Sequence, residues 1–171
     1  MTAVRLLDAA DAIAFREFRL AGLAESPASF GSGVDDEQSK TTAEWRDRVT
    51  PTDASAVFGA FEDHDLVGVV RVVREAGLKQ MHRASITSMY VAPAARHRGV
   101  AAELLQRALS HAQCWEGLRQ VELAVTVGNA SAIRLYQRFN FVEFGRVPTA
   151  LLVDGEYYDE LLMVRVLRSA S

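Results

Sequence analysis

Two hydrophobic periodicities divide the chain into strands and helices. Runs of β-branched and alternating apolar residues predict strands, and apolar residues spaced three and four apart predict helices. The predicted strands lie at residues 4–7, 56–62, 66–74, 84–91, 120–127, 141–147 and 157–167. The predicted helices lie at residues 41–49, 101–115 and 130–139, after a first helix that follows a cap at Asp8 or Asp11 and ends near residue 24. The polar, Gly-containing stretch at residues 29–40 predicts a loop of the kind that covers a site.

The order of these segments predicts a mixed α/β fold. The strand at 84–91, the helix at 101–115 and the strand at 120–127 form a crossover, which joins two parallel strands by a right-handed connection. Asp154-Gly155 instead predicts a hairpin turn. We therefore expect a largely antiparallel central sheet with one parallel strand–helix–strand crossover and helices on both faces. No internal repeat or linker interrupts the sequence, so residues 1–171 should form a single domain.

Composition is that of an ordinary globular protein, because 49% of the residues are hydrophobic and 24% are charged. The formal net charge of −3 gives no general attraction to nucleic acid or to an anionic membrane, so we expect neither as a partner. The single cysteine, Cys114, excludes an internal disulfide, and the four histidines show no metal-ligand spacing, so we assign no metal. The first residues lack the features of a signal peptide or a membrane span, which favours a cytoplasmic protein.

The most distinctive motif is RHRGVA at residues 96–101, between a predicted strand and a predicted helix. Unpaired amides at a helix N-terminus, together with the helix dipole, attract anions. Gly99 has no Cβ to keep a pyrophosphate from the backbone. A P-loop requires Gly-Lys-Ser/Thr and a dinucleotide fingerprint requires G-x-G-x-x-G, and this motif has neither. It therefore predicts a phosphate cradle, although an ordinary basic turn before a helix would have the same letters.

Two ordered segments together resemble a known family. Residues 88–101, SMYVAPAARHRGVA, match a strand, a Pro-containing loop and a Q/R-x-x-G-x-G/A signature. Residues 129–141, NASAIRLYQRFNF, match N-x-x-A-x-x-L-Y-x-x-x-G-F, with Asn140 in place of the usual glycine. Asn tolerates the left-handed conformation better than other residues with a side chain, so this departure leaves the fold assignment intact. The chain resembles, over its whole length, the GNAT superfamily of acetyl-CoA-dependent N-acetyltransferases.

This resemblance implies acetyl-CoA as co-substrate and a set of residues that bind it. Members of the family hold the pantetheine arm and the thioester by the backbone of the strand before the loop. They hold the pyrophosphate by the amides of the loop and of the first helical turn. A further side-chain contact corresponds to Asn129, which is equally typical of a plain helix cap. The implied cofactor-binding residues are Met89, Tyr90, Val91, His97, Arg98, Gly99, Val100, Ala101, Ala102 and Asn129.

The same resemblance makes Tyr136 the catalytic general acid. Direct attack of an amine on the thioester expels a thiolate. A phenol with a pKa of about 10 is protonated at neutral pH and can donate its proton to that thiolate. A tyrosine on the apolar face of a helix is otherwise typical of core packing, so the assignment follows from the resemblance and not from the spacing.

The general base is less evident. An acceptor ammonium with a pKa of about 10.4 must lose a proton before its nitrogen can attack. Relatives carry carboxylates at positions that are Thr87-Ser88 or Ala124 here. Glu122 shares a strand face with Ala124 and is our candidate for a base acting through water, although it is also typical of a solvent-facing residue. Asp36 and Glu37 could bind a cationic acceptor or could simply be solvated.

These observations favour an N-acetyltransferase that moves an acetyl group from acetyl-CoA to a primary amine of a small molecule, or less favourably of a peptide, by direct attack. Two alternatives remain open: a non-catalytic acyl-CoA-binding module that has lost its base, and a transferase of a longer acyl group. An acetyl-cysteine intermediate is disfavoured, because neither His nor an acid flanks Cys114 in a nucleophile pattern. The sequence leaves the acceptor undefined and does not decide between a monomer and a homodimer.

Overall fold

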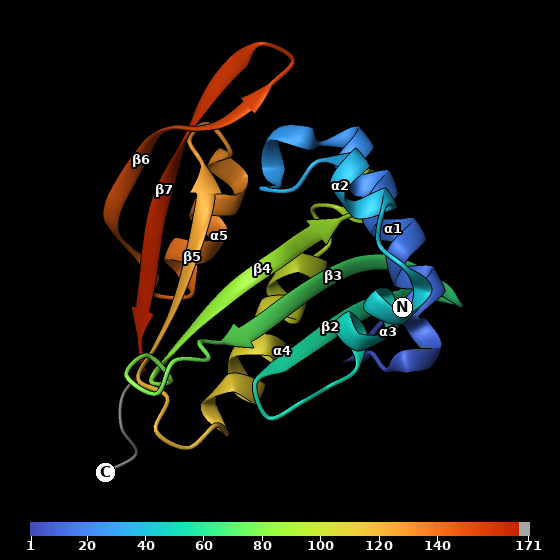
Figure 1. Cartoon of the computed structure of the whole chain (residues 1–171), viewed down its shortest axis with the longest axis horizontal. Coiled ribbons are helices and arrows are strands. Elements are labelled where there is room, and N and C mark those ends of the chain that lie inside the picture. The colour runs from blue at the N-terminus through green and yellow to red at the C-terminus, as the bar shows by residue number, and fades with distance from the viewer. Residues whose placement is uncertain (168–171) are drawn as a thin grey trace.

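The structure is a seven-stranded sheet flanked by helices (Figure 1). This computed structural model describes residues 1–167, so positions 168–171 of the expected domain lie outside the described range. The strands are β1 (Thr2–Leu6), β2 (Ser55–Glu62), β3 (Asp65–Arg74), β4 (Arg83–Val91), β5 (Gln120–Thr126), β6 (Val142–Val153) and β7 (Glu156–Val166). The helices are α1 (Ala12–Glu25), α2 (Val34–Gln38), α3 (Thr42–Val49), α4 (Val100–Gln113) and α5 (Ala130–Arg138), with short 3₁₀ turns η1 (Ala9–Asp11), η2 (Pro27–Ser29) and η3 (Pro93–Ala95).

The strand order is β1-β2-β3-β4-β5-β7-β6. Within the described residues every neighbouring pair of strands is antiparallel except β4 and β5, which run parallel and are joined by α4. This confirms the predicted fold class, including the single strand–helix–strand crossover. Helices cover both faces of the sheet, as expected (Figure 1).

The parallel pair is joined over a short length. Residues Arg83–Ser85 of β4 lie in register with Gln120–Glu122 of β5. Past this point β4 continues to Val91 along β3, while β5 continues to Thr126 along β7. Figure 1 shows the two strands diverging beyond the paired end. The sheet therefore opens into a V whose inner edges have no strand partner among the described residues.

A bulge in β4 lies inside this V. The register between β3 and β4 shifts around Val69 and Arg71, and Ser88 has a φ of +56°. A positive φ is uncommon for a residue with a side chain and is held only where surrounding contacts compensate for it. The bulge re-aims the side chains of β4 just before the segment that the sequence assigns to the thioester.

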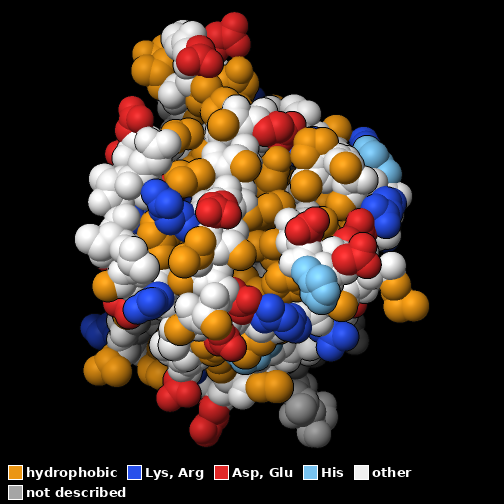
Figure 2. All heavy atoms as spheres, turned by 90° about the vertical axis from the view of Figure 1, so that its right-hand side faces the viewer, with side chains coloured by type: hydrophobic (Ala, Val, Ile, Leu, Met, Phe, Trp, Pro, Cys, Tyr) orange, Lys and Arg blue, Asp and Glu red, His pale blue; other side chains and the backbone are white. Residues whose placement is uncertain are grey.

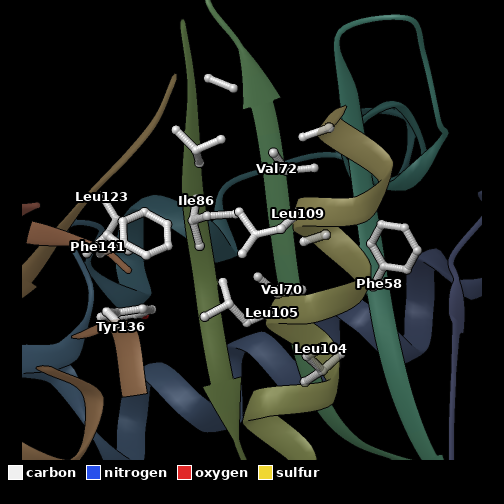
Figure 3. Packing of buried hydrophobic residues seen from close by; sticks show 14 of the residues in the cluster. Phe58, Val70, Val72, Ile86, Leu104, Leu105, Leu109, Leu123, Tyr136 and Phe141 are labelled. Carbon is white, nitrogen blue, oxygen red and sulfur yellow. The ribbon is translucent and has the colours of Figure 1, made fainter. Parts of the chain in front are cut away.

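The larger core lies between the sheet and the face covered by α4 and α5. Figure 3 shows Leu104, Leu105 and Leu109 of α4 against β2, β3 and β4. It also shows Phe141 beside Leu123, with Tyr136 of α5 on the other side of Phe141. The residues labelled there are Phe58, Val70, Val72, Ile86, Leu104, Leu105, Leu109, Leu123, Tyr136 and Phe141. Tyr136 and Phe141 meet edge to face, with ring centroids 5.8 Å apart. The predicted apolar stripe of the crossover helix is thus buried.

A second core lies on the opposite face, under α1 and α3. Phe15 of α1 and Trp45 of α3 are almost wholly buried and pack edge to face. The helix comes close to β4 at Gly22, where an added Cβ would lie 2.9 Å from the ring of Tyr90. The absence of a side chain at Gly22 therefore allows α1 to rest directly on the strand that borders the V.

Two predicted segments differ from the structure. The expected loop at 29–40 contains the helix α2, because Asp36 accepts a hydrogen bond from the Gly33 amide and closes a helical turn within the polar run. The strand expected at 141–147 extends to Val153, because two register shifts let β6 continue past positions that break its alternating pattern. The Asp154-Gly155 turn is confirmed, since both residues have positive φ.

Charged residues of both signs are distributed over the surface. On the face shown in Figure 2, acidic and basic side chains lie close to one another with hydrophobic side chains between them. No described helix has both the length and the apolar character needed to cross a bilayer.

Candidate active site

The V between β4 and β5 contains two adjoining cavities. The larger has a volume of about 490 Å³ and lies between the end of β4, the start of α4 and one side of α5. The smaller has a volume of about 100 Å³ and is bordered by β4, β5, β7 and α5. Five residues line both: Ser29, Met89, Asn129, Ala132 and Tyr136. A ligand that entered the larger cavity would therefore point its end into the smaller one.

The larger cavity ends at the N-terminus of α4. Gly99 precedes this helix with a φ of +83°, and a Cβ added there would meet nothing within 4 Å. The first bond of the helix runs from the Glu103 amide to the Gly99 carbonyl, 3.1 Å apart. The amides of Val100, Ala101 and Ala102 therefore precede the hydrogen-bond ladder. The cavity thus meets a helix terminus with free donors and partial positive charge, which suits an anionic group.

The two arginines of the RHRGVA motif are held in ion pairs. Arg96 donates to the Val91 carbonyl (2.9 Å) and pairs with Glu25 (2.8 Å), and Arg98 pairs with Glu62 (2.7 Å). Both guanidinium groups are therefore held by carboxylates instead of adding unpaired charge to the loop. Arg98 does not line the cavity, whereas its neighbours His97 and Gly99 do.

The wall formed by β4 contains the three residues predicted to meet the thioester arm. Met89, Tyr90 and Val91 all line the larger cavity. Tyr90 is fixed from behind, because its hydroxyl donates to Glu25 at the end of α1 (2.9 Å). Glu25 also accepts hydrogen bonds from the Ser26 hydroxyl and from the Arg96 guanidinium. Together with the bond from Tyr90, these lower the pKa of its carboxyl to about 2. This network joins α1, β4 and the loop before α4 at the mouth of the cavity.

The opposite wall is formed by α5. Asn129 caps this helix by accepting from the Ala132 amide (3.3 Å), as predicted, and also lines both cavities. Tyr136 is 6% exposed, and burial raises the pKa of its phenol. Within the described residues its hydroxyl takes part in no hydrogen bond. Tyr136 therefore combines a packed ring with a protonated hydroxyl, and the residue lines both cavities.

Glu122 lies apart from these residues. It sits at the closed end of the V, where Arg83 donates two hydrogen bonds of 2.8 Å to its carboxylate. These bonds lower the pKa of Glu122, which makes the carboxylate a weaker base. Glu122 lines neither cavity. The sequence predicts that Glu122 shares a strand face with Ala124. It does not show that β4 and β5 are still paired where Glu122 lies.

Two charged residues line the cavities without having been singled out from the sequence. Arg138, near the end of α5, borders the larger cavity. Glu160, on β7, borders the smaller one together with Tyr136 and Met89. Arg138 occupies a variable position of the segment 129–141, and Glu160 lies outside both motif segments. The alternation of side chains along β7 predicts which face of the sheet Glu160 occupies. Which residues of β5 lie opposite Glu160 depends on the register of the long β6–β7 hairpin.

A buried ion cluster forms the base of the α1–α2 region. Arg19 of α1 is 5% exposed and Glu37 of α2 is 1% exposed, and they pair at 3.0 Å. Arg48 of α3 also pairs with Glu37 (3.0 Å), and both arginines donate to the Ser88 hydroxyl, at 3.1 and 3.5 Å. The alternatives for Glu37, a solvated carboxylate or a ligand for a cationic acceptor, are therefore wrong. Glu37 instead joins three helices to the bulge of β4.

The ionisation of Glu37 depends on these arginines. Burial alone would raise the pKa of its carboxyl, but the charges of Arg19 and Arg48 outweigh it and bring the pKa to about 2. Burial lowers the pKa of Arg19, as does repulsion from Arg48. No group of three potential metal ligands occurs in the described part of the chain. The cluster is thus an internal ion network.

Comparisons with known proteins agree with the motif assignment. The profile of the acetyltransferase (GNAT) family matches residues 7–141. An L-amino acid N-acetyltransferase of Escherichia coli is 29% identical over 122 residues, which cover 71% of this chain and 75% of that protein. A spermidine N(1)-acetyltransferase of Vibrio cholerae is 30% identical over 95 residues, 56% of this chain and about half (53%) of that relative.

The fold matches a solved structure over a larger share of the chain than these two relatives match in sequence. A putative acetyltransferase from Salmonella typhimurium, solved with its cofactor acetyl-CoA, superposes with a TM-score of 0.81 at 21% identity. The match covers 100% of this chain and 96% of the other. At this level of identity the likeness concerns the fold alone.

The ion cluster leads to a prediction about stability. Glu37→Gln leaves Arg19 and Arg48 without a carboxylate, so we expect the free energy of unfolding at neutral pH to fall by about 3–5 kcal/mol. Because folding lowers the pKa of Glu37 from 4.5 to about 2, its stabilisation is complete above pH 4.5 and is lost as the pH falls toward 2. Urea unfolding at several pH values measures both effects.

The control is Asp35→Asn, which neutralises an exposed carboxylate two residues away on the same helix. It should change the unfolding free energy by less than about 0.5 kcal/mol. A similar loss in both variants would show that Glu37 contributes only through general surface charge.

Proposed function

Since this chain belongs to the acetyltransferase (GNAT) family, whose co-substrate is acetyl-CoA, we propose that it transfers the acetyl group to a primary amine of a small molecule. The observation that carries this proposal is the cavity that begins at the free amides of α4 and ends beside Tyr136. A diphosphate at one end and a thioester at the other require this combination of an anion site and a proton donor.

Each part of the cavity has a role under this proposal. The amides of residues 97–102 bind the pyrophosphate, with Gly99 leaving them accessible. The backbone of Met89, Tyr90 and Val91 lies along the pantetheine arm, on the edge of β4 that β5 does not pair. Asn129 contributes its side-chain amide while it caps α5. We propose residues 1–171 as one acetyltransferase domain, and its cytoplasmic location stays a prediction.

Direct transfer is the mechanism that these positions favour. The amine nitrogen forms a bond with the thioester carbon, the C–S bond breaks, and the CoA thiolate takes a proton. Because burial raises the pKa of Tyr136, its phenol is protonated at neutral pH and available to this thiolate. Cys114 follows the C-terminus of α4, whereas Gly99 precedes its N-terminus. Cys114 also lines neither cavity, so it is not positioned to accept the acetyl group.

The acceptor class is supported by two relatives of different kinds. One is an L-amino acid N-acetyltransferase and the other a spermidine N(1)-acetyltransferase, so the shared chemistry is a small molecule with an amine. The carboxylate of Glu160, which lines the same cavity as Tyr136, argues against a module that binds acyl-CoA without reacting. The experiment that tests the function is release of free CoA from acetyl-CoA with spermidine, other polyamines, L-amino acids, aminoglycosides and peptides as acceptors. Turnover with an amine supports the proposal, and CoA binding without turnover on any acceptor overturns it.

The anion site can be tested at Gly99. Gly99→Ala places a methyl group at the start of the free amides, and we expect CoA affinity to fall by about tenfold or more, because hydrogen bonds to a charged ligand are each worth about 1.5–3 kcal/mol. Titration calorimetry with CoA measures this change. Gly155→Ala is the matched control, since Gly155 also has a positive φ (+82°) and open space before it, but lies in the β6–β7 turn. Similar CoA affinities in both variants would contradict the assignment of the pyrophosphate site to the amides that follow Gly99.

The proposed acid can be separated from core packing by Tyr136→Phe, which keeps the ring and deletes the hydroxyl. Because that hydroxyl takes part in no hydrogen bond in the described structure, the fold should persist. We expect kcat to fall by roughly 10²–10⁴ with little change in CoA affinity. Steady-state kinetics with the best acceptor provide the measurement, and Tyr157→Phe, an exposed tyrosine on β7, is the control. If kcat stayed within about threefold of the parent, Tyr136 would be a packing residue.

A further inference from the structure

The position of Glu160 on β7 suggests what replaces the missing base. Glu160 lies opposite Thr126 of β5 and Val147 of β6. Glu122, on the same face of the sheet, lies opposite Val164, four residues further along β7 toward the closed end of the V. The two carboxylates are thus at opposite ends of one face. Glu160 is at the end where β4 and β5 have separated.

Its neighbour on the strand has a different environment. Asp159 points to the other face, where Arg146 pairs with it (2.6 Å) and the Thr149 amide donates to it (2.8 Å). The side-chain carboxylate of Glu160 receives no hydrogen bond and forms no ion pair with any described residue. One carboxylate is therefore used to hold the hairpin together, and the adjacent one remains available to a ligand.

The surroundings of Glu160 favour a cation. The other side chains that line the smaller cavity are hydroxyl, alkyl, thioether, amide and phenol groups, so within that lining Glu160 is the sole charged group. From β5 the facing side chain is Thr126, from η2 it is Ser29, and from β4 they are Thr87 and Ser88. The positive charges of Arg19 and Arg48 stay behind Ser88, neutralised in part by Glu37. An ammonium group in this cavity would meet one carboxylate and several hydroxyl oxygens.

The position of this carboxylate also suits the reaction. Tyr136 approaches the cavity from α5, Met89 borders it from β4, and Glu160 enters from β7. The acid and the carboxylate therefore come from different elements and stand on different sides of the space between the strands. A thioester placed along Met89 would have a proton donor near its sulfur and an acceptor of protons near the attacking amine.

We propose that Glu160 binds the ammonium group of the acceptor and removes its proton, an assignment that rests on the proposed acetyl transfer. The carboxylate takes one proton from R–NH₃⁺ and leaves R–NH₂, whose lone pair forms the C–N bond as the C–S bond breaks. The amide nitrogen loses its second proton to solvent, and the thiolate receives one from Tyr136. The acceptor is thus a cationic primary amine, and Glu160 contributes both to its binding and to its activation.

The test is the pH dependence of Glu160→Gln. With acetyl-CoA and whichever of spermidine or the L-amino acids the parent acetylates fastest, kcat/KM of the variant at pH 7 should be about 100-fold or more below that of the parent. The deficit should shrink to about tenfold or less as the pH approaches the pKa of the acceptor ammonium, because solution then supplies the neutral amine. CoA affinity, measured by calorimetry, should be unchanged.

Asp159→Asn is the control, since it removes the adjacent carboxylate from the opposite face and should leave kcat/KM within about threefold of the parent at every pH. A deficit in Glu160→Gln that is the same at every pH, or one smaller than threefold, would overturn the assignment. Failure of the parent to acetylate any amine would instead overturn the proposed function, so the two results are distinguishable.

Discussion

The separation of β4 from β5 is the constraint on which the site depends. Parallel strands that stayed paired would use both edges of β4 for the sheet, as the ladder with β3 already uses one. Because pairing ends at Ser85 and Glu122, backbone groups on the other edge of β4 remain available to a ligand. The same divergence brings the start of α4, the side of α5 and the face of β7 around one space. The cavities therefore result from the divergence of β4 and β5, and the side chains that line them determine their chemistry.

Two different kinds of packing hold the strands apart. On one face, Tyr136 and Phe141 fill the space beside Leu123 with rigid rings (Figure 3). On the other, Arg19 and Arg48 bind the hydroxyl of Ser88 and keep β4 in its bulged conformation. A buried network of ions is a costly way to stabilise a fold, because removing charges from water offsets much of their attraction. In this protein the ion pairs and hydrogen bonds of the network set the positions of α1, α2 and α3 relative to β4.

The sequence predicts the parts of this site that arise from local rules. Gly99 marks a positive φ before a helix, Asn129 a cap and Asn140 a left-handed residue, and each depends on neighbours within a few positions. Glu122 and Glu160 could not be ranked in this way, because their environments depend on how far β4 follows β5 and on the register of β7. The burial of Glu37 had the same cause. Its polar neighbours indicate a loop, while the partners that make burial possible come from α1 and α3.

Under the proposed mechanism, burial of Tyr136 and ion pairing of Glu122 set the two residues apart as proton carriers. A phenol needs its proton when the thiolate leaves, and desolvation keeps the proton on Tyr136. A base needs a carboxylate whose pKa is not lowered by an ion pair with a guanidinium. Arg83 forms such a pair with Glu122 and makes it a weaker base. Glu160 has no such partner and faces the hydroxyl-lined cavity directly. Under the proposed mechanism, an acid protected from water by a packed core and a base reached from the open end of the V act on one thioester without neutralising each other.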